Sequence, residues 1–241
     1  MIPLRDDNPV QTTPVVTVGI IVAATLVFFY QLSLGPQAGQ RFVYQFGAIP
    51  AVLFGQESLP LEVAAVPASF SLITSMFLHG GFMHLIGNML YLWIFGNNIE
   101  DAVGHARFIG FYLLCGVVAA MSHALVDPGS PAPMIGASGA ISGVLGAYLL
   151  LYPRAHVLVL IPLGFFTRLM HIPAGFVLGF WFVLQLISGT ATVGGGGGGV
   201  AWFAHIGGFL AGMVLIGLFK RRSVRFFNPS PHRSSRPFSD G

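Results

Sequence analysis

Six long apolar stretches constrain this chain more than any other feature of its sequence. Each is about as long as an α-helix that crosses a bilayer, which needs roughly 17 to 25 residues. Their apolar residues run continuously instead of alternating, which favours helices over a β-barrel. We therefore expect an all-α, polytopic membrane protein with a bundle of six transmembrane helices. The expected spans are 15–34, 82–99, 106–126, 136–152, 172–189 and 200–219.

Composition and charge agree with this class. Of the 241 residues, 54% are hydrophobic and 8% are charged, whereas soluble domains are about 25% charged. An even number of spans puts both termini on one side, and that side then holds every Lys and Arg except Arg41. The positive-inside rule predicts that both termini are cytoplasmic, in what we expect to be a bacterial plasma membrane. This topology explains the basic balance of the chain, so no nucleic-acid partner is expected.

The chain divides into three segments. Residues 1–14 are expected to be a cytoplasmic N-terminal segment, 15–219 the membrane domain, and 220–241 a basic, disordered cytoplasmic tail. No small-residue cleavage site closes the first apolar run, so we expect it to be a retained anchor. Six consecutive glycines at 194–199 are compatible with a plain linker or with a hinge.

The absence of acidic residues from the spans excludes several chemistries. All eight Asp and Glu residues lie at termini, in loops or at span edges. An aspartyl intramembrane protease and a proton-coupled carrier would both need an embedded carboxylate. The chain lacks a His-Glu-x-x-His zinc motif, and Cys115 is its single cysteine. We expect neither a metal nor a cofactor.

Four polar side chains from three spans are predicted to lie at one depth in the membrane. With a rise of 1.5 Å per residue, Ser138 and His205 each lie about 22 Å above the cytosolic end of their span. His84 and Asn88 lie about 24 and 18 Å above the same face. Other polar residues are less central, because His123 and Gln185 lie near span ends and His79 lies in a loop.

Two glycine pairs indicate how the fourth and sixth spans meet. Gly139 and Gly143 are four residues apart in one span, and Gly208 and Gly212 are four apart in the other. Such small-residue faces allow two helix backbones to approach closely. A close crossing would let the serine and the histidine touch. The alternative is that the glycines only pack helices and the polar residues only bond across them.

Nucleophilic catalysis is the chemistry that these residues favour. A serine hydroxyl becomes a good nucleophile when a base accepts its proton, so Ser138 is the candidate nucleophile and His205 the candidate base. His84 and Asn88 are four residues apart and face the same way, and both can donate hydrogen bonds to an oxyanion. Without an embedded acid, the pair is expected to be a dyad.

The three motifs together resemble those of the rhomboid intramembrane serine proteases. They are GASGAISG at 136–143, AHIGGFLAG at 204–212 and HGGFMHLIGN at 79–88. The resemblance implies a six-helix rhomboid-type bundle with a Ser138–His205 dyad and an oxyanion site at His84 and Asn88. It also implies a serine-type endopeptidase whose partners are transmembrane protein substrates and the lipid bilayer.

Two departures from the family pattern affect these expectations. Residues 68–74 lack the Trp-Arg pair that many members carry, which bears on how the first loop is anchored. Ser142 stands where some members have an aromatic residue that stacks on the histidine, so the group that orients His205 is open. The alternatives to a protease are an inactive rhomboid-like binder of membrane proteins and a transporter. The sequence leaves the substrate, its cleavage site and the oligomeric state open.

Overall fold

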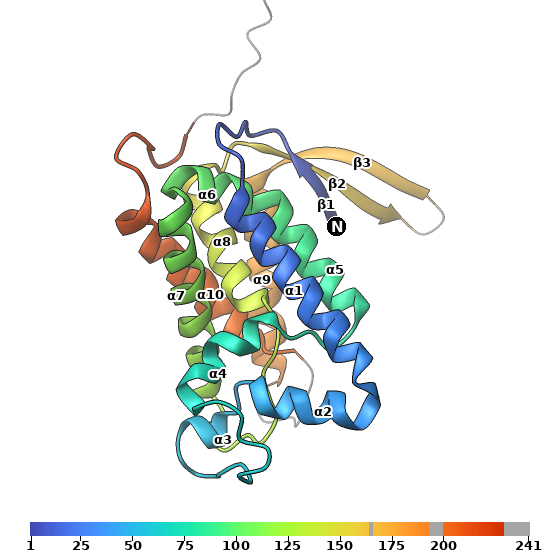
Figure 1. Cartoon of the computed structure of the whole chain (residues 1–241). Helices are drawn as coiled ribbons and strands as arrows, with labels where there is room; N and C mark the ends of the chain where they lie inside the picture. The colour runs from blue at the N-terminus through green and yellow to red at the C-terminus, as the bar shows by residue number, and fades with distance from the viewer. Residues whose placement is uncertain (164–165, 193–199, 229–241) are drawn as a thin grey trace, which may run out of the picture.

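The long elements of the chain are helices, and they follow the expected spans closely (Figure 1). The computed structural model describes residues 1–163, 166–192 and 200–228. Helix bounds agree with the expected ranges to within a few residues. The agreement is close because a continuous apolar stretch is a strong signal for a buried or lipid-facing helix. The corresponding elements are α1 (Val15–Ser33), α5 (Phe82–Tyr91) with the π-helical turn η2 (Leu92–Gly96) and α6 (Asn97–Val103), α7 (His105–Ala124), α8 (Ser138–Leu151), α9 (Ala174–Thr192) and α10 (Trp202–Phe219).

Length and composition single out most of these helices as membrane-crossing. Within the described ranges, α1, α7, α9 and α10 are each long and apolar enough to span a bilayer. A bent pair with an 85° turn, Ala68–Phe77 and Phe82–Val103, would make a fifth span. Helix α8 has 14 residues and is therefore about 21 Å long. The chain is thus a multi-pass membrane protein, while the count of six spans stays a prediction.

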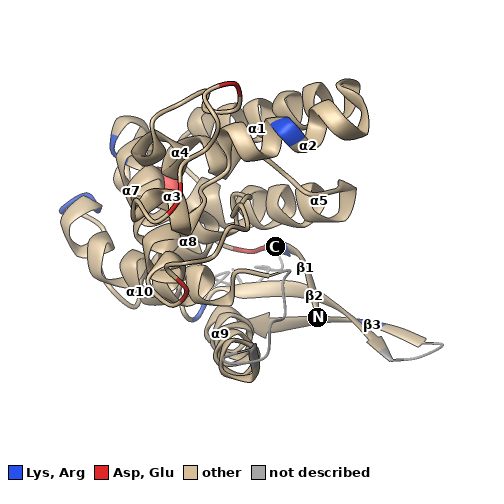
Figure 2. Cartoon of the chain, turned by 90° about the horizontal axis from the view of Figure 1, so that it is seen from below, with Lys and Arg blue, Asp and Glu red and all other residues tan. Residues whose placement is uncertain are grey.

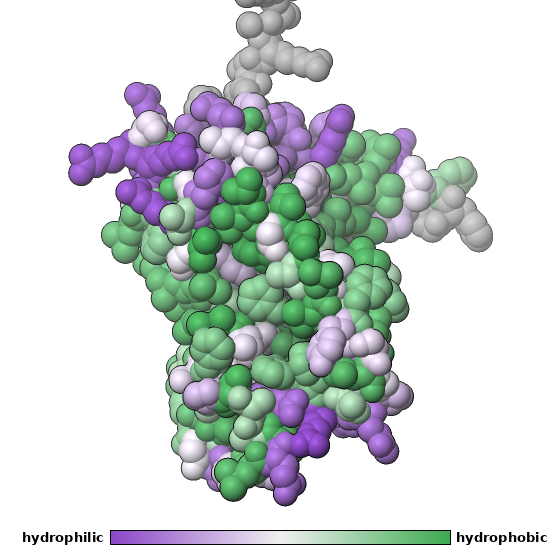
Figure 3. Space-filling model, in the orientation of Figure 1, coloured by the Kyte–Doolittle hydropathy of each residue, from purple (hydrophilic) through white to green (hydrophobic). Residues whose placement is uncertain are grey.

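The surface has the distribution that a bilayer requires. On the face shown in Figure 3, hydrophobic residues form a broad band across the middle, and hydrophilic residues gather at the two ends. Charged residues are sparse along the ribbon (Figure 2). Large apolar side chains on the outside of the bundle, such as Leu26, Phe176 and Val214, are 65%, 73% and 74% exposed. Their exposure is favourable only in contact with lipid.

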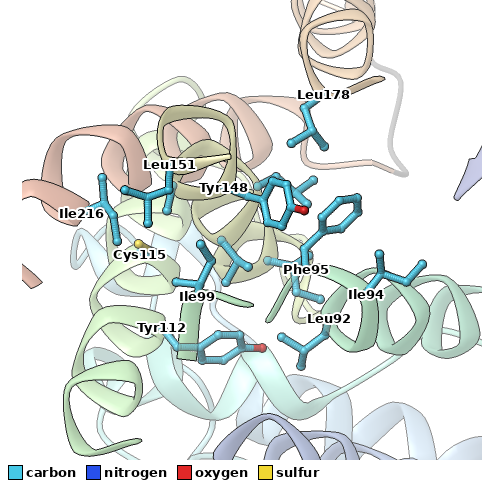
Figure 4. Close-up of a cluster of buried hydrophobic side chains, with 14 of the residues drawn as sticks. Leu92, Ile94, Phe95, Ile99, Tyr112, Cys115, Tyr148, Leu151, Leu178 and Ile216 are labelled. Atoms are coloured by element: carbon cyan, nitrogen blue, oxygen red, sulfur yellow. The ribbon is translucent and has the colours of Figure 1, made fainter. Parts of the chain in front are cut away.

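Helix α8 is the centre of the bundle. Nearly all of its side chains are buried, and it lies against both α7 and α10. Tyr148 of α8 packs edge-on against Phe95 of η2, with ring centroids 5.0 Å apart, in the apolar core drawn in Figure 4. A short helix that is surrounded by protein can begin below the membrane surface. The free N–H and C=O groups at its ends face protein and not lipid, so they need not reach the headgroups.

The close crossing of α8 and α10 confirms the prediction made from glycine spacing. A Cβ on Gly212 would overlap the backbone of Gly143, and one on Gly208 would overlap the Gly139 carbonyl. Only glycine allows the two backbones to approach this closely. The crossing brings the start of α8 beside the start of α10.

A three-stranded antiparallel sheet covers one end of the bundle, and the sequence did not indicate it. Strand β1 (Ile2–Asp6) pairs with β2 (His156–Leu163), which pairs with β3 (Phe166–Pro173). The N-terminal segment is therefore held against the connection between α8 and α9. Val157 and Val159 alternate on β2 and are fully buried against the bundle.

The opposite end carries shorter helices within the first loop (Figure 1). Residues 35–81 form α2 (Gly35–Phe46), α3 (Pro50–Leu53), α4 (Ala68–Thr74) and the 3₁₀ turn η1 (Ser75–Phe77). After α10, the backbone N–H of Arg221 donates to the Ala102 carbonyl at 2.9 Å. The first part of the expected tail therefore folds back on the bundle. Residues 229–241 and the glycines at 194–199 lie outside the described residues.

Glu100 is a buried acid inside a helix, where the sequence placed it at a span edge. The helix runs to Val103, and the Glu100 side chain is fully buried. Its carboxylate accepts hydrogen bonds from the backbone N–H groups of Val16 and Thr17 at 2.9 and 2.7 Å, and it lies 2.6 Å from Nδ1 of His105. It therefore satisfies the free N–H groups at the start of α1, which lacks a side-chain cap of its own.

Candidate active site

Ser138 is the first residue of α8 and is half-buried, directly before the buried part of that helix. The preceding Gly136 has φ +117°, a left-handed conformation that favours glycine, and a Cβ there would lie 2.7 Å from His84 Nε2. Gly136 N–H donates to the Ser75 carbonyl at 2.8 Å, which fixes the turn against η1. The helix start also leaves backbone N–H groups without intrahelical acceptors beside Ser138.

His205 lies on the first turn of α10, and the crossing of α8 and α10 brings it to the serine. Its Nε2 is 2.9 Å from Ser138 Oγ. The two residues are 67 positions apart in the chain and come from different helices. This geometry permits direct proton transfer between the hydroxyl and the imidazole.

The other ring nitrogen of His205 contacts a residue that the sequence analysis did not assign to the site. Nδ1 of His205 is 2.8 Å from Oε1 of Gln185, on α9. Gln185 is 7% exposed. The expected span ended at 189, so Gln185 was placed near its edge, whereas α9 continues to Thr192. Its polarity within an apolar helix was the signal that could have found it.

Two aromatic rings, one from α9 and one from the helix of His205 itself, lie against His205, whereas Ser142 does not contribute a ring. The Trp181 ring of α9 lies 5.9 Å from the imidazole at 39°, and the Trp202 ring lies 6.1 Å away at 90°. The Ser142 hydroxyl donates to the Ser138 carbonyl at 2.6 Å, within its own helix. The rings that confine the imidazole therefore come from α9 and α10.

His84 and Asn88 border the same turn from α5. Both are the side chains nearest to a Cβ built on Gly136, at 2.7 Å from His84 Nε2 and 3.7 Å from Asn88 Nδ2. Gly80 N–H donates to Nδ1 of His84 at 3.3 Å, so the neutral imidazole carries its proton on Nε2, the nitrogen nearer Gly136. Asn88 Nδ2 is buried and has no hydrogen-bond partner among the described residues.

Two further histidines of the region, His79 and His123, contact backbone or aromatic groups. His79 is fully buried, its Nδ1 lies 3.3 Å from the Phe77 carbonyl, and its ring packs edge-on against His84 at 5.2 Å. His123 packs against Phe203. No group of three His, Cys, Asp or Glu side chains suited to a metal ion occurs in the described part of the chain.

The arrangement has the components of acyl-transfer chemistry. A hydroxyl faces a histidine nitrogen at hydrogen-bond distance, and a third side chain contacts the other ring nitrogen. Two side-chain donors lie beside Gly136, two residues before Ser138, and the helix start adds free N–H groups, so these donors could serve a developing oxyanion.

Relatives of known type cover most of the chain. Rhomboid protein 1, mitochondrial, of Saccharomyces cerevisiae is 28% identical over 200 residues, which cover 77% of this chain and 55% of that protein. Rhomboid protease GluP of Bacillus subtilis is 30% identical over 197 residues, covering 81% of this chain and 34% of that protein. Rhomboid-like protein 11, chloroplastic, of Arabidopsis thaliana is 32% identical over 165 residues, covering 64% and 54%.

The chain spans about half or less of the length of these three relatives. One of them is named a protease, and the others are named for the family alone. The family model of the rhomboid domain matches residues 68–222 of the sequence. That range includes α5, α8 and α10 with all four predicted site residues. By this match and by its bundle of apolar helices, the chain belongs to the rhomboid family.

Proposed function

We propose that the protein is an intramembrane serine endopeptidase that hydrolyses peptide bonds in or near transmembrane segments of other membrane proteins. The observation that carries the proposal is the 2.9 Å contact between Ser138 Oγ and His205 Nε2 inside an apolar bundle. Support also comes from the family, since one matched relative is named a rhomboid protease.

The proposed reaction begins when His205 Nε2 takes the hydroxyl proton of Ser138 and Oγ bonds to the scissile carbonyl carbon. The carbonyl oxygen becomes an oxyanion beside Asn88 Nδ2, His84 Nε2 and the N–H groups at the start of α8. Collapse of this intermediate breaks the C–N bond, and the leaving amine takes the proton from Nε2. A water molecule then attacks the acyl-enzyme in the same way and releases the acid.

The proposed setting is a cell membrane with both termini in the cytoplasm. Support comes from three basic residues in segments that belong to or adjoin the sheet end: Arg5 on β1, Arg154 between α8 and β2, and Lys220 directly after α10. Arg41 lies on α2, and that helix is at the other end of the bundle (Figure 1). The positive-inside rule then assigns the sheet end to the cytoplasm. Two of the relatives are named mitochondrial and chloroplastic, so members of the family occur in more than one cellular compartment.

The test compares wild type, Ser138→Ala and Ser142→Ala in lipid vesicles. Each is treated with a fluorophosphonate probe and, separately, with a panel of single-span proteins whose products are identified by mass spectrometry. Loss of a serine nucleophile lowers kcat by about a millionfold, so Ser138→Ala is expected to give neither labelling nor cleavage.

Ser142→Ala is the matched control, because within the described part of the chain the Ser142 hydroxyl bonds to the Ser138 carbonyl, one turn away in the same helix. It is expected to retain both activities. Cleavage by Ser138→Ala would contradict the proposal. Absence of labelling and cleavage in the wild type would instead favour a non-catalytic binder of membrane proteins.

A further inference from the structure

Gln185 links α9 to the histidine of the site through a short hydrogen-bond chain. Its side chain is almost completely buried, in a helix whose adjoining residues 181–184 and 186–187 are apolar. A buried amide in such a place is costly unless its polar atoms are paired. Both ends of this amide have partners, Trp181 on one side and His205 on the other.

The contact with Trp181 determines which end of the amide faces the histidine. The atom 3.2 Å from the Trp181 carbonyl oxygen must be a donor, because a carbonyl oxygen only accepts. That atom is therefore the NH₂ group, and the amide oxygen points to His205. With the amide reversed, two oxygens would face each other without a proton between them.

The amide oxygen in turn determines the tautomer of His205. An amide oxygen only accepts, so the Nδ1 atom that lies 2.8 Å from it must carry the proton. A neutral imidazole has a single N–H, which leaves Nε2 with a free lone pair. That lone pair is the one 2.9 Å from Ser138 Oγ. The chain from the Trp181 carbonyl to the serine therefore holds the imidazole in the form that can accept a proton.

We propose that Gln185 is a positioning residue that fixes the tautomer and the ring orientation of His205. The inference rests on the proposed function, since it concerns the base of that reaction. A neutral amide performs the task that a carboxylate performs in a Ser-His-Asp triad, and it avoids burying a charge at membrane depth. Trp181, one turn earlier on the same helix, both orients the amide and packs against the imidazole.

The test compares Gln185→Leu, Gln185→Glu and the control Thr190→Val with wild type. Leu is branched and one atom shorter and cannot accept a hydrogen bond, whereas Glu has the length of Gln and retains an acceptor oxygen whether or not it is ionised. Thr190 lies on α9, and among the described residues its hydroxyl bonds to the Leu186 and Ile187 carbonyls of its own helix. Rates are measured for the fluorophosphonate probe, and kcat and KM for a cleaved single-span protein.

Gln185→Leu is expected to lower kcat by about ten- to a hundredfold with little change in KM. Loss of the group that orients a metal-ligating histidine has an effect of this size in metalloenzymes. Gln185→Glu is expected to recover much of that loss, and Thr190→Val to match wild type. A purely structural role would make Leu and Glu equally harmful or affect KM and kcat together. Wild-type rates in Gln185→Leu, or no recovery in Gln185→Glu, would overturn the inference.

Nitrogen NMR of ¹⁵N-histidine-labelled protein supplies a readout independent of activity. In wild type, the His205 signals, assigned by comparison with His205→Ala, are expected to show a protonated Nδ1 and a bare Nε2. In Gln185→Leu the second tautomer is expected to be populated as well. An unchanged tautomer in that variant would count against the inference. Failure of Ser138 labelling in wild type would count against the proposed function, so the two failures are distinguishable.

Discussion

At the scale of single residues, Asn88 stands out among the candidate site residues because its donor is both buried and unpaired. Its side-chain nitrogen is buried and lacks a partner among the residues that the structure describes, and it lies close to the turn before Ser138. Leaving a buried amide donor unpaired costs about 1–3 kcal/mol in the resting protein. A donor held without a partner is ready to bind an oxyanion when one forms.

We therefore expect Asn88→Ala to lower kcat by about a hundred- to a thousandfold with little change in KM, because the lost hydrogen bond would be made only in the transition state. Kinetics of cleavage in vesicles would measure both constants. The matched control is Asn98→Ala, which removes the same side chain from a position where it bonds to Asp6. A rise in KM at constant kcat would show that Asn88 binds substrate and not the oxyanion.

The residues of the site differ in how far the sequence could place them. Helix rise alone puts Ser138, His205, His84 and Asn88 at one level, and the structure brings them together around Gly136. The polarity of Gln185 marks it as a candidate, but its partner could not be predicted, because the mostly apolar residues around it do not indicate which face of the span meets the bundle. Its partner in the site depends on how α9 is rotated, which is set by tertiary packing.

At the scale of elements, the contact between α8 and α10 is the one that assembles the candidate pair. The Cβ of any residue at position 212 would overlap the Gly143 backbone, which cannot move without displacing all of α8. By contrast, a Cβ on Gly217, farther along α10, would only touch the ring of Phe226 at 3.8 Å.

Gly212→Ala is accordingly expected to destabilise the protein by about 1–3 kcal/mol through overpacking. It should also slow labelling of Ser138, because separated backbones lengthen the distance to His205. Gly217→Ala makes the same chemical change in the same helix and is expected to be neutral or stabilising by up to about 1 kcal/mol. Thermal unfolding and labelling rates would measure both effects, and equal stability of the two variants would contradict the packing argument.

The three strands are too short for hydropathy analysis of the sequence to detect. Windows of about 20 residues detect spans, whereas β2 and β3 have eight residues each. Strand β1 has five residues and depends on β2 for its hydrogen bonds, so its own sequence carries little signal. The pairing of segments this distant in the chain is decided by the fold.

At the scale of the whole molecule, the sheet fastens the N-terminus to the bundle, and one carboxyl group participates in that contact. Asp6 Oδ2 accepts hydrogen bonds from the Tyr148 hydroxyl at 2.6 Å and from Asn98 at 2.8 Å. Burial raises the pKa of Asp6 from 3.8 to about 6, although the hydrogen bond from Tyr148 lowers it. The nearby charge of Asp7 raises it further.

This pKa predicts that stability depends on pH. The folded state binds the Asp6 proton more tightly than the unfolded chain does, so the stabilisation is complete below about pH 4 and is lost as the pH rises through about 6. With allowance for partial solvent exposure, the loss is about 1–2 kcal/mol. Asp6→Asn cannot ionise, so its stability relative to wild type should rise across this range. Denaturation at several pH values would measure the difference, and parallel curves for the two proteins would contradict it.

The pairing of β1 with β2 also has a consequence for synthesis. Ile2 pairs with Leu160, so the strand that is translated first must wait for roughly 150 further residues before its partner exists. At about 5–20 residues per second, that delay is on the order of ten seconds. The helices from α1 to α8 are therefore made before the sheet can close. The N-terminal strand therefore pairs late. It can pair only after α8 has been made and the segment that follows α8 lies next to β1.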